Sequence, residues 1–356
     1  MLRLDRYLSQ RFLAGLALAL LVLLALFNLI ALAEELEDVG QASFTLPDAL
    51  WVTVLTTPKR IVELLPVTAL LGGLLGLGAM ANDRELIVIR AVGLSKRRIA
   101  RTIGALAFVL CLGIVTLQFA VVPGLESEAA ALRAQALQSA DARERSGALW
   151  TRDGQDLIRI GGVRNDRALN DVEIYSTDAT GSLVNLVQAA DALSAGDNRW
   201  LLRDVLESRF QGAQVTETRR DTLYWNDLLS EETGAVLMLP LEALAPDDLV
   251  RTIVTLKRNQ LDTHRYEIVL WQQVSLLPGL LAMSLLSLPF LLGSVRSVSA
   301  GQRVMIGGLV GISFYLLQQL SGQLAGLLGI NPALVILAPS LILLAIAVGA
   351  IWQRDN

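Results

Sequence analysis

Side chains that could carry out chemistry are few in this sequence. It has one cysteine, Cys111, and one histidine, His264, so an internal disulfide, a thiol metal cluster and a histidine-based triad are all excluded. No GxxxxGK[ST] phosphate loop, HExxH or GxSxG motif occurs. The sequence therefore predicts a protein that is not an enzyme, with no catalytic residue, metal ligand or cofactor of its own.

The most distinctive short stretch is residues 82–95, NDRELIVIRAVGLS. Glu85 opens a run that mixes apolar and charged residues, and Gly93 ends it, so the run could form a helix lying in the membrane plane. A basic interfacial loop would have the same composition. In the functional alternative, the apolar side chains fill a groove on a cytoplasmic partner and Glu85 meets a basic residue there.

The rest of the chain is strongly apolar. A mean hydropathy of +0.51, with 53% hydrophobic and 18% charged residues, indicates an integral membrane protein. About 20 apolar residues span the hydrocarbon layer of about 30 Å. Residues 1–11 carry three arginines among leucines and predict a short interfacial helix. Six runs of sufficient length follow: 12–33, 61–81, 103–122, 268–292, 304–328 and 333–352.

Residues 31–33, Ala-Leu-Ala, imitate a signal-peptidase site behind the first apolar run. A cleavable hydrophobic segment is usually shorter, about 7–15 residues, so we expect an uncleaved anchor. In the second run, Gly72 and Gly76 form a GxxxG pair that allows close helix packing. In the fifth run, Gln318, Gln319 and Gln323 predict either hydrogen bonds to a neighbouring helix or a polar path.

A polar insert, residues 124–265, separates the two apolar halves. It holds 23 Asp and Glu against 16 Lys and Arg, a net charge of −7, and must lie in water. Helical stretches at 124–145 and 247–260 flank it, the second with Asp247 or Asp248 as its N-cap. Between them, short β-like runs broken by Gly, Asp and Asn predict a sandwich, jelly roll or open barrel. These runs are 150–152, 157–160, 172–175, 183–187, 200–203, 205–210, 215–218 and 222–225.

The distribution of Lys and Arg predicts the orientation. Twelve of these residues lie at one set of loops and ends, whereas the opposite short loops offer only Lys59 and Arg60. Both termini are therefore expected in the cytoplasm and the insert in the periplasm. The predicted domains are residues 1–123, an N-terminal membrane half with a cytoplasmic coupling helix at about 82–95; 124–265, the periplasmic domain with its helical connectors; and 266–356, a C-terminal membrane half.

Motifs spread along the whole chain resemble one known family. They include Leu4-Asp5-Arg6-Tyr7, Pro58-Lys59, the loop from Glu85 to Ser95, Arg133-Ala134-Gln135, Leu149 to Gly154, Arg296-Ser297-Val298 and Gly311-Ile312-Ser313-Phe314. With this order and spacing, the chain resembles the LptF/LptG permeases of the lipopolysaccharide-export ABC transporter, and most of all the G-type members.

This resemblance implies a membrane α+β fold, in which six transmembrane helices, three plus three, flank a periplasmic β-jellyroll inserted between helices 3 and 4. It implies a multi-pass protein of the bacterial inner membrane that moves lipopolysaccharide. The implied partners are an F-type permease subunit, two copies of a cytoplasmic ABC ATPase that binds ATP and Mg, a single-span LptC-like jellyroll protein and an LptA-like bridge protein; nucleic acid is not among them.

Two other classes of function remain. A permease of another ABC-type envelope lipid or lipoprotein exporter usually has four spans and an insert after the first, which the three-plus-three pattern disfavours. A membrane enzyme acting on envelope lipids would need an acid–base cluster within the membrane, which the sequence does not indicate.

The resemblance also implies roles for individual residues. Residues of the 82–95 loop would couple to the ATPase: Glu85, Leu86 and Arg90. Basic residues near the outer rim of the cavity would meet lipid phosphates: Lys59, Arg60 and Arg133. Residues of the fifth run would form the cavity wall and a gate beside the first span: Phe314, Tyr315 and Leu316.

The chain departs from the family pattern after its first span. Where the family often has lysines facing the lipid head group, this sequence has Glu34, Glu35, Glu37 and Asp38. Either divalent cations bridge these carboxylates to phosphates, or the head group is recognised by Lys59, Arg60, Arg133 and the partner subunit. The retained basic residues favour the second hypothesis.

Overall fold

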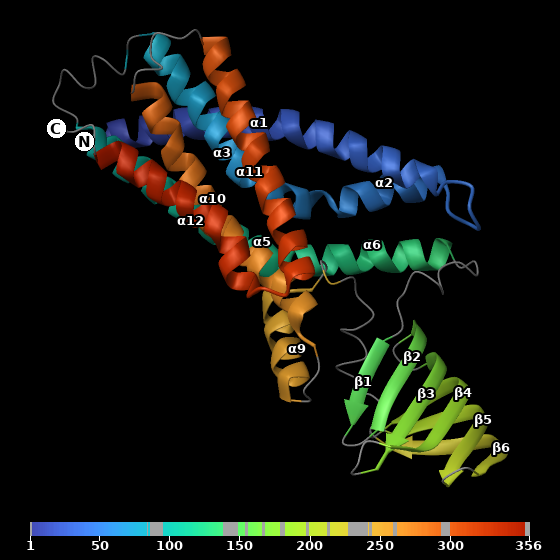
Figure 1. Ribbon diagram of the computed structural model, residues 1–356. Coiled ribbons are helices and arrows are strands. Elements are labelled where there is room, and N and C mark those ends of the chain that lie inside the picture. Colours follow the sequence, from blue (N-terminus) through green and yellow to red (C-terminus); the bar gives the residue numbers. More distant parts are fainter. Residues whose placement is uncertain are drawn as a thin grey trace.

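Among the residues that the structure describes, six helices are long and apolar enough to cross a membrane (Figure 1). The computed structural model describes residues 2–83, 85, 95–137, 149–153, 156–165, 168–178, 182–196, 199–211, 214–226, 241, 244–258, 262–292 and 300–352. The spanning helices are α1 (Leu2–Glu37), α3 (Thr57–Asn82), α5 (Lys96–Ala120), α10 (His264–Leu292), α11 (Ala300–Leu328) and α12 (Pro332–Trp352). Three precede the β-sheet and three follow it, which confirms the predicted fold class.

Helix α3 lies at the centre of this bundle. In its most apolar stretch 72% of residues are buried, against 56% or less in the other five helices. It packs against α1, α10 and α11, and Leu70, Leu77 and Met80 are among its fully buried side chains. The first residues of α1 and the last of α12 lie at the same end of the bundle, where the Arg97 guanidinium lies 5.2 Å from the centre of the Trp352 ring.

Helix α1 is continuous over 36 residues, about 54 Å at 1.5 Å per residue. The prediction of a separate interfacial helix at residues 1–11 is therefore wrong. Leu8 and Phe12 are fully buried in the bundle core, and the Asp5 carboxylate bonds to Arg98 and Thr102 of α5. These contacts hold the first three turns against protein instead of along the lipid surface.

Glycines bring α1 and α3 into backbone contact. A Cβ built on Gly76 would lie 2.0 Å from the Arg11 carbonyl oxygen, and one on Gly72 would lie 2.4 Å from the Leu16 Cα. From the other side, a Cβ on Gly15 would lie 2.2 Å from the Gly72 carbonyl oxygen. The GxxxG pair therefore does form a close helix–helix contact, as its spacing suggested.

Three further helices lie at the ends of the spans nearest the sheet: α2 (Leu46–Leu55), α6 (Val122–Ala136) and α9 (Pro246–Arg258). Helix α6 continues α5 after Val121, as predicted. Helix α2 was not predicted, because ten residues are too few to stand out from the neighbouring span. Helix α9 begins at Pro246, so Asp247 and Asp248 lie in its first turn and the prediction that one of them is the N-cap is wrong.

The insert forms one six-stranded antiparallel sheet in sequential order. Its strands are β1 (Leu149–Asp153), β2 (Asp156–Asn165), β3 (Ala168–Thr177), β4 (Leu183–Gly196), β5 (Arg199–Gln211) and β6 (Gln214–Asn226). The β domain is confirmed, and its described strands form a single meander (Figure 1). Two pairs of predicted strands are joined, 200–203 with 205–210 in β5 and 215–218 with 222–225 in β6.

A row of residues crosses five strands without ladder partners. The register is the same on both sides of the row; Ile160 pairs with Val172 and Gly162 with Asn170. Within the row, Asp171 and Asp204 have φ angles of 52° and 50°. We call this row the crease, and its members are Gly161, Asp171, Ala190, Asp204 and Asp221.

The crease shifts the burial pattern of β3, β4 and β5. Buried residues on either side of it are three positions apart instead of two, as in Leu169 and Val172 of β3 and Leu202 and Val205 of β5. Both halves of the strands therefore contribute side chains to one core. Asp204 bends β5 instead of ending it, which explains why two predicted strands are one.

The α1–α3 contact gives a prediction about stability. Gly76→Ala would push a methyl group into the Arg11 carbonyl, so the helices must separate; we expect a loss of about 1–3 kcal/mol. Thermal unfolding of the purified protein in detergent would measure it. Gly113→Ala is the matched control, since nothing lies within 4 Å of a Cβ there. Equal unfolding temperatures for both variants would contradict the close contact.

Candidate functional site

A pocket of about 400 Å³ lies between α3, α10 and α11. Lys59 and Glu63 line it from α3, and Phe314 and Tyr315 from α11. Lys59 is the third residue of α3, so its ammonium group belongs to the end of the helix nearest the sheet. The pocket thus combines a charged rim with an aromatic wall, which suits a molecule that is polar at one end and apolar at the other.

The aromatic wall also touches α1. The Phe27 and Tyr315 ring centroids are 5.7 Å apart with an interplanar angle of 72°, an edge-to-face contact. Phe314 is 3% exposed and packs over Gly279, where a Cβ would lie 2.9 Å from the Phe314 Cζ. Leu316, by contrast, is 52% exposed on the outer surface of α11 and does not line the pocket. Of the three predicted wall residues, the structure brings two together.

The floor of the pocket is rich in amides. Gln318 and Gln319 line it, as do residues that the sequence analysis did not single out: Gln118, Gln272, Gln273 and Ser275. The Gln318 Nε2 atom lies 2.9 Å from Ser275 Oγ and 3.0 Å from Ser340 Oγ. Gln318 therefore both bonds to neighbouring helices and faces the pocket, whereas Gln323 is exposed and lines nothing there. In the sequence, these pocket residues could have been recognised because they are polar side chains on otherwise apolar spans.

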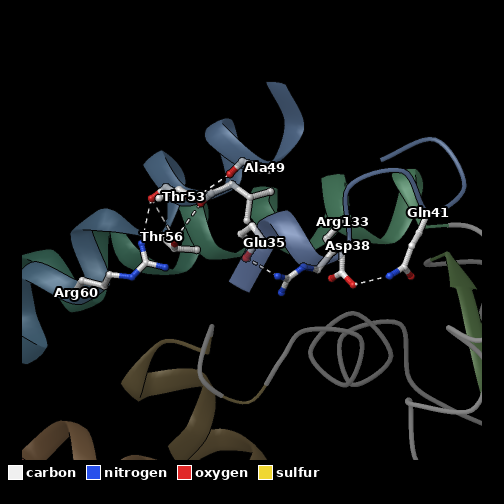
Figure 2. Close-up of polar contacts among 9 residues, drawn as sticks. Glu35, Asp38, Gln41, Ala49, Thr53, Thr56, Arg60 and Arg133 are labelled. Carbon is white, nitrogen blue, oxygen red and sulfur yellow. Dashed lines mark hydrogen bonds and ion pairs between the residues drawn. The ribbon is translucent and has the colours of Figure 1, made fainter. Parts of the chain in front are cut away.

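The other predicted basic residues lie beside the pocket, at the rim formed by α1, α2 and α6 (Figure 2). Arg60 donates to Asn28 Oδ1 at 3.0 Å and to the Thr53 carbonyl at 3.1 Å. Arg133 forms an ion pair with Glu35, whose side chain is 8% exposed. Figure 2 shows these two arginines directed at partners within the chain.

Lys59 has an acidic neighbour too, with its Nζ 4.0 Å from Glu126 Oε2. Three basic side chains predicted to meet lipid phosphates therefore each have a partner in the same chain. The sequence analysis missed the pairing of Glu35 with Arg133, because the two residues are on helices far apart in the sequence. The role of Lys59, Arg60 and Arg133 in binding lipid phosphate stays a prediction.

Around the rim, a small apolar core joins α1, α2 and α6 through Phe44, Ala49, Val52, Leu55 and Ala129. Helix α2 begins after Thr45, whose backbone N–H donates to the Asp48 carboxylate at 2.9 Å. Hydrogen bonds from the Thr45 hydroxyl and backbone hold the pKa of Asp48 below its usual range. The rim is thus held in place by this apolar packing and by Asp48 in the first turn of α2.

At the other end of the bundle, Glu85 is held by α1. The Tyr7 hydroxyl donates to Glu85 Oε2 at 2.9 Å, and the Arg11 guanidinium donates to the same hydroxyl oxygen at 2.8 and 3.0 Å. Tyr7 and Arg11 were not predicted as functional; their spacing of four residues on one helix face was the available signal. Leu86 and Arg90, and with them most of the predicted helix 82–95, lie outside the described residues.

Comparisons with known proteins agree on one family. Residues 6–353 match the family model described as lipopolysaccharide export system permease LptF/LptG. The chain is 30% identical over 341 residues to the lipopolysaccharide export system permease protein LptG of Haemophilus influenzae, covering 95% of each chain. It is 31% identical over 339 residues to the protein of the same name in Escherichia coli, covering 95% of this chain and 94% of that one.

The family model spans nearly the whole chain, and both relatives match the helices and the sheet alike. The family consists of transport permeases, which agrees with the expectation that the chain is not an enzyme. The chain therefore belongs to the LptF/LptG family of lipopolysaccharide export permeases, as one of its LptG-type members.

Proposed function

We propose that this chain forms one half of a permease that extracts lipopolysaccharide from the outer leaflet of the bacterial inner membrane. The observation that carries the proposal is the pocket between α3, α10 and α11, with Lys59 at its rim and Phe314 and Tyr315 in its wall. Charge-assisted contacts suit a phosphorylated head group, and aromatic and aliphatic walls suit acyl chains.

The second half of the permease would be an F-type subunit, and lipid would reach the pocket laterally beside α1 and α11. The Phe27–Tyr315 contact is the point at which these two helices meet at the level of the pocket. Edge-to-face ring contacts contribute about 0.5–1.5 kcal/mol, little enough to separate during transport. Separation of these rings would open the pocket toward the membrane.

Energy would come from two copies of a separate cytoplasmic ATPase, which bind ATP and Mg. Glu85 would contact that ATPase, and the Tyr7 hydroxyl bonded to it belongs to α1. The same helix carries Phe27 about 30 Å further along its axis, at 1.5 Å per residue. A push on Glu85 would thereby reach the gate through one rigid helix.

The extracted lipid would pass to the β domain in the periplasm, with both chain termini in the cytoplasm. The domain has two sheet edges, β1 and β6, and nearly all side chains of β6 are at least one-third exposed. An open edge can pair with a strand of another β domain. An LptC-like single-span partner and an LptA-like bridge protein would continue the apolar groove in this way.

Photocrosslinking in the assembled transporter tests the route. A photoreactive residue at Tyr315 should give a lipopolysaccharide adduct without nucleotide, and one at Trp225, partly buried against the β-domain core, should give it only during ATP hydrolysis. A photoreactive residue at Leu316, which is exposed on α11 and does not line the pocket, serves as the control. Absence of adducts at both Tyr315 and Trp225 in an assembled, ATP-hydrolysing complex would remove the proposed route.

Coupling is tested at Glu85. Glu85→Arg should abolish co-purification with the ATPase, because the charge that meets a basic residue is reversed. Tyr7→Phe should keep co-purification but lower ATP-driven transport about two- to fivefold, since one hydrogen bond contributes about 0.5–1 kcal/mol to holding the carboxylate. Tyr266→Phe, in the first turn of α10, is the matched control. Unchanged assembly and transport in Glu85→Arg would refute the docking role.

A third test separates structure from lipid binding at Arg133. If its main partner is Glu35, Arg133→Ala leaves a buried carboxylate without its cation and should lower stability by about 1–3 kcal/mol, and Glu35→Ala added to it should restore part of the loss. Thermal unfolding would measure both. If lipid phosphate is the main partner, Arg133→Ala should instead reduce lipopolysaccharide crosslinking at Tyr315 while leaving the unfolding temperature unchanged.

A further inference from the structure

Two amide oxygens in the pocket have no hydrogen-bond partner. They are Oε1 of Gln273 and Oε1 of Gln318, both of which are buried. Both residues line the pocket described above. Each therefore presents an acceptor in a place where an acceptor without a donor costs free energy.

The orientation of the Gln318 amide follows from its neighbours. The Ser275 hydroxyl donates its one hydrogen to the Gln272 carbonyl at 2.7 Å, and the Ser340 hydroxyl donates its own to the Ser275 carbonyl at 3.1 Å. Both hydroxyl oxygens can then only accept, and the two N–H groups of Gln318 supply them. A flipped amide would set oxygen against oxygen, so Oε1 is the atom turned away from the serines.

The Gln273 amide is fixed in the same way. Its Nε2 donates to the Leu244 carbonyl at 3.2 Å, and a flip would bring two carbonyl oxygens together. Gln318 thus spends both N–H groups on protein and Gln273 spends one of its two, and each keeps an oxygen unused. The ligand that completes them must bring hydrogen-bond donors.

The two glutamines lie well inside the ends of their helices, so their unused oxygens do not belong to the outer surface of the bundle. Gln318 is ten residues from Leu328, the last residue of α11, and Gln273 is nine residues from His264, the first of α10. At 1.5 Å per residue both lie about 14–15 Å inside the ends of their helices. Lys59, by comparison, lies in the first turn of α3.

We propose that this amide floor is a subsite for hydrogen-bond donors, and that it takes the hydroxyl and amide N–H groups of an acylated sugar. The inference rests on the proposed function, in which a glycolipid passes through the pocket, and it assigns different parts of the head group to different ends. Ionised phosphate oxygens accept but do not donate, so they fit Lys59 at the rim and not the two unused amide oxygens.

Two photoreactive probes test the subsite in the full chain assembled with its partner subunits in lipid nanodiscs. One is dodecyl glucoside with a diazirine in its alkyl chain; the other has the same chain and a dimethylamine oxide head, which accepts but cannot donate. Labelled α10 and α11 peptides would be quantified by mass spectrometry and normalised to labelling of α12. The glucoside should label α10 and α11 at least about fivefold more, the effect of one net hydrogen bond.

Substitutions test whether the preference for the glucoside depends on the side-chain oxygens of Gln273 and Gln318. Gln273→Met and Gln318→Met should each reduce the glucoside preference several-fold, and Gln323→Met, on the same helix but outside the pocket, should leave it unchanged. The comparison of the two probes uses the chain without substitutions, so its result does not depend on whether a variant folds. Equal labelling by both probes, as expected if water satisfies the oxygens, overturns the subsite, and so does a preference that survives both pocket variants.

The subsite and the transport route fail separately. A lipopolysaccharide adduct at Tyr315 together with equal labelling by the two probes would overturn the subsite and leave the route in place. A glucoside preference that depends on Gln273 and Gln318, without any lipopolysaccharide adduct, would support the subsite and point to another glycolipid as the substrate.

Discussion

The backbone contact between α1 and α3 is the constraint on which the other sites depend. With Gly15, Gly72 and Gly76 at the contact, the two helices approach more closely than any side chain would allow. This approach sets where α1, a single continuous helix, lies against α3. Tyr7 then reaches Glu85 at one end, Phe27 meets Tyr315 in the middle and Glu35 meets Arg133 at the other end.

The membrane part handles its polar groups in two ways. At the rim, opposite charges pair within the chain, as Glu35 does with Arg133, so buried charge is compensated before any ligand arrives. In the pocket floor, Gln318 donates to two serine hydroxyls and Gln273 to a carbonyl, and the Oε1 atom of each has no partner. The rim therefore pairs its charges within the chain, whereas the floor keeps unused amide oxygens.

Hydropathy and turn residues were sufficient to predict the six spans, the polar insert and its β structure, because each depends on local sequence period. Pairings between distant helices could not be predicted in this way. For the acidic stretch after the first span, the sequence analysis considered divalent cations as partners and not Arg133 of α6, which pairs with Glu35. Residues 1–11 had the composition of a surface helix, but Leu8 and Phe12 are buried by α3 and α5, which sequence alone does not bring near.

The sequence analysis divided β5 into two strands, 200–203 and 205–210, for a different reason. An aspartate between two β-like runs usually indicates a turn, whereas Asp204 adopts a left-handed conformation that bends the strand and lets it continue. One residue from each of β2 to β6 aligns in the crease, which therefore forms a hinge line between the two halves of the sheet. A change in the angle between these two halves would change the width of the β-domain interior. It would break no ladder pair, because the crease residues have no ladder partners. Such a change would be a single collective motion of β2 to β6.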